Sequence, residues 1–549
     1  MASFWKLPVS PLNRAATRRC LGRGRILLLG LMVGCPVYSG SAQQAGESYR
    51  NLLLAIQQRI EQRDFAGARF LLSNAHSKFP SDGGLENLLG VIEIQEGHPD
   101  RATQDFKAAI RHAPNLASAY LNLGRIYMQA GDQDKTAPSS ALRVYGALLR
   151  REPENSEANY QIAMLLLQRQ NFQRSKDHLE RLSEDDRERL GAQIVLCADE
   201  AALGHADAAD TIAGRIVAAP DLVEQDGLEM LPALRLAHRA DLIELIFTAI
   251  NDRKPLSPEG LRLLGLAQEG EGKFGIARAT LERAFAQDSS SVSILIDLTR
   301  VAKASKDFEG ALGYLAHARD LRPSDAGFAY EFGVLTIRMG LLGEARKAMG
   351  EAVKLAPDNP EYNFGMGIVS SFSQDATQGL PYLEKYHALR PFDPAALLSI
   401  GTAYYRGKNF ESATVWLKQA ATHRTTAADA HYYLGRIARV EVHLDVAKQE
   451  LEQANKLSPD RPDVLAELGQ VATATHEYPK AGAYLDRAIA LEPENYAANF
   501  GLLQLYARAG DQRKEEQSKR FDTIKNKSEE QYQEMMRVIS ARAGGSPGI

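Results

Sequence analysis

The sequence carries proline, small and large apolar residues in columns that recur every 34 residues. The proline column runs through Pro255, Ser289, Pro323, Pro357, Pro391, Thr425, Pro459 and Pro493. A fixed period in this range is typical of a solenoid, in which each unit packs on its neighbours and not around one central core. The columns therefore predict an array of repeated helical units over more than half of the chain.

A small residue, most often glycine, lies ten residues after most markers of the proline column, with Thr299 as a polar exception. The glycines of this column are Gly90, Gly124, Gly265, Gly333, Gly367, Gly401, Gly435 and Gly469. A glycine inside a helix costs about 1 kcal/mol relative to alanine, so a whole column of it indicates a close contact between two helices. We expect a large apolar side chain of the partner helix to fill each notch.

Two alanine columns flank a column of large apolar residues later in each unit, as in Ala447, Leu451 and Ala454. This pattern resembles the tetratricopeptide repeat (TPR) family, whose unit is a helix pair with a small residue in the first helix, Ala–large–Ala in the second and a proline at the junction. The resemblance covers about residues 47–525. It implies an all-α fold, a right-handed superhelical α-solenoid of about 13–14 TPR helix pairs.

The register of the columns divides the chain into segments. Regular units are expected at 47–182 and 258–510, and five extra residues within 132–140, around Pro138, are expected to form a loop between the helices of one pair. The columns blur over 183–257, where we expect degenerate units and a bend or a seam. Residues 511–542 are rich in charge and predict a capping helix, and residues 543–549 predict a disordered tail.

The first 42 residues have the layout of a secretory signal: a basic start, an apolar run from Ile26 to Cys35, and small residues ending at Ala42. We expect cleavage after Ala42 and an exported chain, periplasmic or secreted. The apolar run is too short for a membrane anchor, so no stable membrane span is expected after signal removal. A transit peptide, a lipoprotein site at Cys35 and a twin-arginine export signal around Arg18 remain alternatives.

Charge and cysteine content narrow the classes of function. The chain has 65 basic and 69 acidic residues, and loss of the six basic residues of the leader would leave a net charge of −10. A nucleic-acid-binding protein is expected to be basic, so we expect no nucleic acid partner. Cys197 is the one cysteine beyond the leader, and its apolar neighbours predict a buried core residue and not a reactive thiol.

Motifs of enzymes are weak in this sequence. The string from Gly270 to Gly275 matches a dinucleotide fingerprint, but its place in the repeat predicts the turn between two helices. His476 and Glu477 begin like a zinc-protease motif, yet Lys480 stands at the second histidine position. We therefore expect no enzyme, no cofactor and no metal site.

The resemblance to the TPR family implies a concave groove lined by the first helices of the pairs, in which a protein or an extended peptide binds. The side chains at the inward positions that we select are Arg125, Tyr160, Arg262, Arg300, Tyr330, Phe364, Tyr432, Arg436 and Phe500. Aromatic residues and arginine dominate the energetics of interfaces. The arginines suggest a ligand that carries carboxylates, and we expect Tyr432 and Arg436 to lie off the small-residue contact columns.

Two alternatives stay open. The aromatic residues of the groove can instead pack against the neighbouring repeat. The same groove could also serve a glycan- or polymer-handling accessory subunit of a cell-envelope assembly or secretion system, because aromatic ring faces stack on sugars. The lysine and asparagine clamp of the chaperone-binding members is not carried over, since the column that holds Arg436 contains no asparagine.

Overall fold

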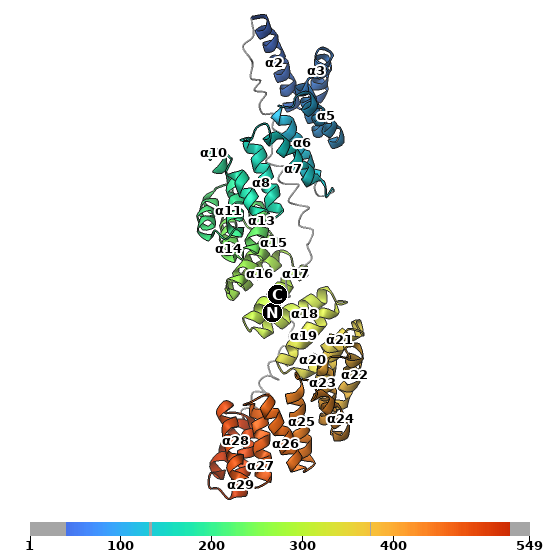
Figure 1. Cartoon of the computed structure of the whole chain (residues 1–549), viewed down its shortest axis with the longest axis vertical. Helices are drawn as coiled ribbons and strands as arrows, with labels where there is room; N and C mark the ends of the chain where they lie inside the picture. The colour runs from blue at the N-terminus through green and yellow to red at the C-terminus, as the bar shows by residue number, and fades with distance from the viewer. Residues whose placement is uncertain (1–39, 131–133, 374, 527–549) are drawn as a thin grey trace. The chain divides into compact units, whose positions relative to one another are not determined.

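The computed structural model describes residues 40–130, 134–373 and 375–526. The described elements are helices that follow one another along the chain, and most pack on a neighbour in sequence (Figure 1). The chain divides into two compact units, Met1–Asp297 and Leu298–Ile549, with the boundary inside helix α17 (Val292–Ala304). The all-helical array expected from the sequence is confirmed. The division falls at this boundary and not within 183–257, where we expected a seam.

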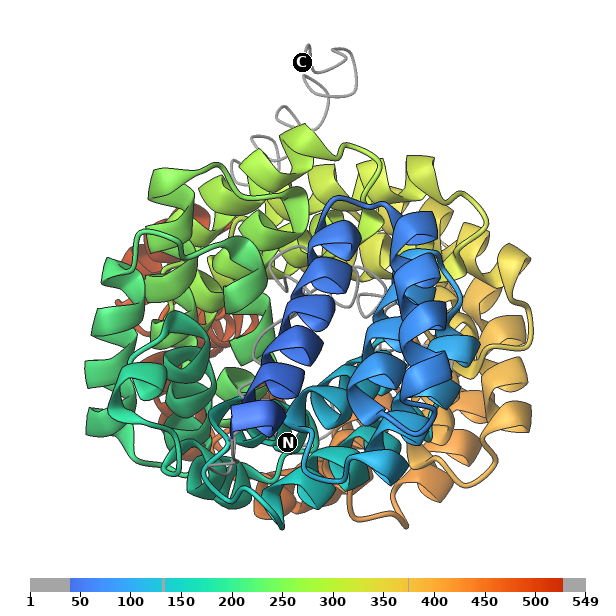
Figure 2. The same ribbon diagram turned by 90° about the horizontal axis from the view of Figure 1, so that it is seen from above.

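The helices of the first unit form consecutive pairs. Their bounds are α2 (Gly40–Glu61), α3 (Phe65–Lys78), α4 (Gly83–Gln95), α5 (Pro99–His112), α6 (Ala117–Ala130), α7 (Ala137–Leu149), α8 (Ser156–Gln168), α9 (Phe172–Leu179), α10 (Glu184–Arg187), α11 (Leu190–Ala202), α12 (Ala206–Ala218), α13 (Glu224–Leu236), α14 (Ala240–Arg253), α15 (Pro258–Gly270) and α16 (Phe274–Gln287). Figure 2 shows the first pair, α2 and α3 in blue, lying side by side and joined by a short loop.

The second unit continues the same alternation of first and second helices. Its helices are α18 (Phe308–Leu321), α19 (Ala326–Arg338), α20 (Leu342–Leu355), α21 (Pro360–Ser370), the 3-10 helix η1 (Ala376–Gly379), α22 (Leu380–Leu389), α23 (Pro394–Arg406), α24 (Phe410–Ala420), α25 (Ala427–Val440), α26 (Leu444–Leu457), α27 (Pro462–Ala474), α28 (Tyr478–Leu491) and α29 (Tyr496–Ala509). Residues 514–526 are helical as well.

The turn inside many pairs places one residue in the left-handed backbone region, two positions before the second helix. Glycine occupies this position at Gly97, Gly204, Gly272 and Gly340, with φ between 72° and 84°. In the pair α25–α26 the residue is Val442, with φ 63°. A β-branched residue is rare in this conformation, so the turn before α26 carries local strain.

The glycine column lies where each first helix meets its second helix. A Cβ added to Gly435 would lie 2.6 Å from Cγ of Leu451, and one added to Gly469 would lie 2.5 Å from Cγ of Leu485. The other six glycines of the column face Phe106, Tyr145, Leu281, Met349, Leu383 and Leu417, at 2.3–2.9 Å. Real Cβ atoms do not approach other atoms this closely, so the helix contact requires a residue without a side chain.

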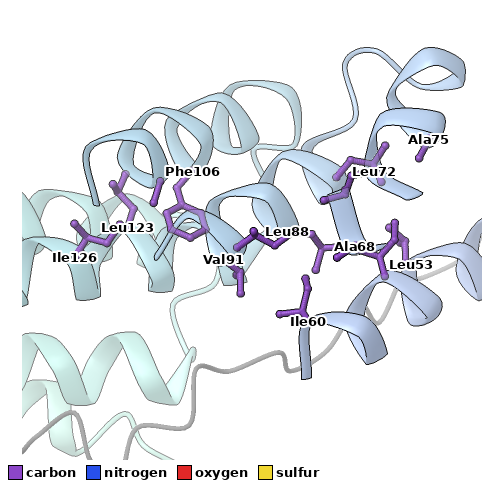
Figure 3. Packing of buried hydrophobic residues seen from close by; sticks show 14 residues of the cluster. Leu53, Ile60, Ala68, Leu72, Ala75, Leu88, Val91, Phe106, Leu123 and Ile126 are labelled. Carbon is purple, nitrogen blue, oxygen red and sulfur yellow. The ribbon is translucent and has the colours of Figure 1, made fainter. Parts of the chain in front are cut away.

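Buried residues form clusters, several of which extend over neighbouring pairs. Around α2 to α6, the buried residues Leu72, Leu88, Phe106 and Leu123 form one cluster (Figure 3). The alanines of the first alanine column, such as Ala447, are fully buried. The repeat columns of the sequence are therefore the packing surfaces between helices.

The irregular segments fold into helices too. Residues 183–257 form α10 to α14, so this segment keeps the paired arrangement although its columns blur. The expected loop at 132–140 is shorter than predicted, because α7 begins at Ala137 and takes Pro138 into its first turn. A proline is tolerated there because its missing N–H would have no partner within the helix.

Segments 1–39 and 543–549, which hold most of the expected signal and the expected tail, lie outside the described residues. The expected capping helix is described over 514–526. There Phe521 packs on Tyr496 and Phe500 of α29, with ring centroids 4.8 and 5.5 Å apart. None of the helices within the described ranges is both long and apolar enough to cross a membrane.

Candidate binding face of the first helices

Aromatic and arginine side chains gather on two consecutive first helices of the second unit, α23 and α25, next to the first helix α27. The guanidinium of Arg436 on α25 lies 5.3 Å from the ring centroid of Tyr405 on α23 and 5.4 Å from that of Tyr432. Tyr405 also contacts Tyr433, with centroids 5.3 Å apart. Cations over aromatic rings attract electrostatically, so Arg436 is held between two tyrosines of neighbouring pairs.

A buried carboxylate on α27 anchors the arginines of α25. Nε of Arg436 lies 3.0 Å from Oε1 of Glu467, and Nε of Arg439 donates to Oε2 of Glu467 at 2.7 Å. The Glu467 side chain is only 5% exposed, whereas those of the two arginines are about 30% exposed. Two cations thus share one buried carboxylate, which fixes both side chains.

Arg461 closes the other side of Tyr432. Its guanidinium lies 5.4 Å from the Tyr432 ring centroid and pairs with Asp429 at 2.7 Å and with Asp463 at 2.6 Å. Burial raises the pKa of Tyr432 and of Tyr405 above the usual value, so both phenols are neutral at physiological pH. Sequence reasoning missed Arg439, Arg461 and Glu467.

This geometry revises the interpretation of Tyr432 and Arg436. Tyr432 is only 9% exposed and belongs to a core cluster with Leu451 and Leu468. Arg436 is already paired with Glu467. These residues are therefore part of the packing between repeats, although they lie off the small-residue columns. Arg436 alone does not indicate a carboxylate ligand, because a carboxylate of the chain neutralises it.

The other arginines selected from the sequence behave similarly where contacts are described. Arg125 on α6 pairs with Glu157 on α8 at 3.2 Å. Arg262 on α15 pairs with Asp297 on α17 at 2.6 Å. Arg300 on α17 is exposed. Arg125 and Arg262 thus connect the first helices of consecutive pairs.

The remaining aromatic residues of the predicted groove also contact their neighbours. Tyr330 lies against Tyr362, with centroids 4.9 Å apart, and Phe364 lies against Tyr386 at 4.7 Å. Tyr160 packs beside the cluster of α8, α9 and α11, and its hydroxyl lies 2.6 Å from where a Cβ of Gly191 would be. Phe500 contacts Phe521, as described above. The alternative that these aromatics pack on the next repeat agrees with the contacts.

The part of this face that solvent can reach is smaller than the predicted groove. Val440, one turn after Arg436 on α25, is 49% exposed. Tyr405, Tyr433 and Arg439 are partly exposed. The accessible part thus combines an apolar side chain, tyrosine rings and a cation, all fixed by neighbours, which is the composition of a preorganised contact surface.

The enzyme-like motifs fall in structural positions. Gly270 ends α15 and Gly272 lies in the turn before α16, as predicted. His476 and Glu477 precede α28, so they do not share a helix face. Cys197 is fully buried, and burial raises the pKa of its thiol to about 12, which opposes reactivity.

One cluster of potential metal ligands forms in the first unit. Oxygen and nitrogen atoms of Glu93, Glu96 and His98 lie within 4.8 Å of one another. Arg69 forms ion pairs with both carboxylates, at 2.7 Å from Oε1 of Glu93. The guanidinium uses the oxygen atoms that a metal ion would need, so the cluster is an ion-pair network.

The fold and the columns define the class of this protein as a helical repeat scaffold. Family models described as tetratricopeptide repeat match residues 87–137, 134–194 and 466–517. The RNA polymerase-associated protein CTR9 of Caenorhabditis elegans is 24% identical over 244 residues, which are 43% of this chain and 21% of the relative. The match thus spans about one fifth of that relative's length.

Solved structures of repeat proteins are similar in fold. The Cut9–Hcn1 hetero-tetramer of APC/C contains a chain with a TM-score of 0.35 and 14% identity, over 83% of this chain and 96% of that chain. A tetratricopeptide repeat protein of Parabacteroides merdae gives 0.34 and 14%, over 45% and 97%. PilW, a type IV pilus biogenesis factor, gives 0.35 and 18%, over 38% and 98%. At these values the likeness says nothing about what this chain binds.

Proposed function

We propose that this protein is a non-enzymatic scaffold that is exported and that binds another protein, or an extended peptide, on the face formed by α23, α25 and α27. The observation that carries the proposal is the group of Tyr405, Arg436 and Arg439 around the buried Glu467. Their side chains are held in place before binding. The scaffold therefore loses little side-chain entropy when a partner docks.

Glycan handling is the weaker alternative for this face. A sugar stacks on a free aromatic ring face, whereas the Tyr432 ring has the guanidinium of Arg436 and that of Arg461 over it. Arginine and tyrosine at the centre of a surface, next to an exposed aliphatic side chain, instead match the composition of protein interfaces.

Two exposed valines allow a matched test by photo-crosslinking in the native host. Val440 ends the first helix α25 and is 49% exposed, and Val446 lies on the second helix α26 and is 50% exposed. A photoreactive amino acid at Val440 should give a crosslinked partner that mass spectrometry identifies. The same group at Val446 should give none. Crosslinking at Val446 alone would place the partner on the second helices and refute the proposal.

A further inference from the structure

A basic pocket of about 500 Å³ lies in the first unit, between α7 and α9, with α8 at its base. Four arginines line it: Arg150 at the end of α7, Arg169 at the end of α8, Arg174 on α9, and Arg181 just beyond α9. None of the described residues that line the pocket is acidic. This concentration of positive charge stands out on a chain whose net charge is −4.

The charges of the pocket are not neutralised by the chain, unlike those of Arg125, Arg262 and Arg436. Arg150, Arg174 and Arg181 are exposed and form no ion pair with any residue of the described segments. Arg169 donates to the hydroxyl of Ser139 at 2.8 Å, a neutral acceptor.

Two acidic residues, one on α9 and one at its end, have other partners. Asp177 accepts a hydrogen bond from Gln173 at 2.9 Å, and Glu180 lies 4.0 Å from the ammonium of Lys176. The charge of Asp177 still acts on His178 and partly offsets the arginines, which outnumber it at the pocket. His178 also lines the pocket, and burial together with the charges of Arg181 and Arg174 lowers the pKa of its ring.

The base of the pocket is apolar. Ile162 and Leu166 of α8 are buried, and Leu142 and Leu149 of α7 are half-buried and remain partly open to solvent. A small inorganic anion would pair with the arginines and leave the apolar base exposed to water. An acyl chain would need an enclosed cavity, which half-exposed leucines do not provide. A peptide that presents carboxylates and an aliphatic side chain uses both parts of the pocket.

We propose that the pocket between α7 and α9 binds an acidic segment of a partner protein, with carboxylates on Arg150, Arg174 and Arg181 and an aliphatic side chain on the base formed by Leu142, Leu149 and Leu166. The site is built mainly by second helices and lies in the other compact unit from the face of α23, α25 and α27. It is therefore independent of the function proposed above.

The test uses the full chain and a fluorescein-labelled synthetic peptide of repeated glutamate–glutamate–leucine triplets. The variant R150Q/R174Q/R181Q removes three exposed charges. The control variant R111Q/R346Q/R424Q removes three exposed arginine charges elsewhere and has the same net charge. Fluorescence anisotropy should show saturable binding to the unmodified chain and to the control. The pocket variant should bind about tenfold more weakly, the combined effect of three exposed ion pairs.

Further arms separate the sources of negative charge. A lysine–lysine–leucine peptide should not bind, and added salt should weaken binding of the acidic peptide. Inorganic phosphate and vesicles that contain phosphatidylserine should not displace the peptide from the pocket. Equal loss in both triple variants would mean that only the overall charge matters, and displacement by phosphate or by the vesicles would identify another ligand; each result would overturn the proposal. Circular dichroism checks that all variants are folded.

Discussion

Replacing Gly435 by alanine tests whether the glycine column is a packing notch. A Cβ at this position would lie 2.6 Å from Cγ and 3.0 Å from Cδ2 of Leu451, and 3.2 Å from the backbone oxygen of Ala447. Leu451 and Ala447 are fully buried. The leucine cannot swing into solvent, so α25 and α26 must move apart to accept the methyl group.

The magnitude follows from two opposing effects. Alanine in place of glycine favours a helix by about 1 kcal/mol. Overpacking a close contact costs about 1–3 kcal/mol. Gly313 supplies the control, because it lies inside α18 and a Cβ there meets no atom within 4 Å. Gly313→Ala should stabilise the protein by about 1 kcal/mol. The free energy of unfolding of Gly435→Ala should be lower than that of Gly313→Ala by the overpacking cost of about 1–3 kcal/mol.

Urea denaturation followed by circular dichroism measures the free energies of unfolding. Because repeat arrays can unfold in parts, hydrogen exchange of peptides from α25 and α26 should accompany it and show faster exchange in Gly435→Ala. Gly435→Leu should destabilise by several kcal/mol, on the order of other severe overpacking changes. If Gly435→Ala and Gly313→Ala stabilise the chain equally, the interpretation of the column as a notch is refuted.

Other predictions concern strain, a buried acid, the ion-pair network and the leader. Val442→Gly should raise stability by about 1 kcal/mol, because it relieves a left-handed β-branched residue, and thermal unfolding against Val446→Gly, inside α26, is the check. The carboxyl of Asp199 is fully buried, and burial raises its pKa from 3.8 to about 7, so the folded state holds its proton more tightly than the unfolded state does. Stability should therefore fall as pH rises from about 4 through about 7, and Asp199→Asn should remove this loss and be more stable at pH 8 by about 2–4 kcal/mol; identical pH profiles for both proteins would contradict it. Glu467→Gln should destabilise the protein by about 1–3 kcal/mol, since Arg436 and Arg439 lose the carboxylate that anchors them. Glu441→Gln, at the exposed residue that follows α25, should have almost no effect on the free energy of unfolding. Intact-mass measurement of protein from the host should give an amino terminus near Gln43, and retention of residues 1–42 or a lipid on Cys35 would exclude the expected cleavage.

The sequence predicted the helix pairs well, because each column reports one local steric requirement. A glycine such as Gly469 is needed wherever the leucine sixteen residues later enters the helix contact, so its recurrence shows the pairing directly. Segment 183–257 keeps its pairs with larger residues at the small positions, such as Leu231, which is buried in α13. The columns therefore blur in this segment although the pairing of helices continues.

The binding face was harder to predict, because the state of an arginine depends on a second residue one repeat away. Arg125 and Glu157 are 32 residues apart, as are Arg319 and Glu351. A single column shows the arginine and not its carboxylate partner. The burial of Tyr432 was hard to predict for the same reason. The arginines that cover its ring come from its own helix and from the start of the next first helix.

The same spacing separates structural arginines from candidate binding arginines. At 31 and 32 residues after Arg150 stand Arg181 and Leu182, and after Arg174 stand His205 and Ala206. No carboxylate stands at these two spacings, and Glu184 and Asp207, at 34 and 33 residues, form no ion pair with these arginines. The structure shows Arg150 and Arg174 exposed at the pocket. An arginine that forms no ion pair with the neighbouring repeat keeps its charge for a partner, whereas one that forms such a pair, as Arg125 does, connects the repeats.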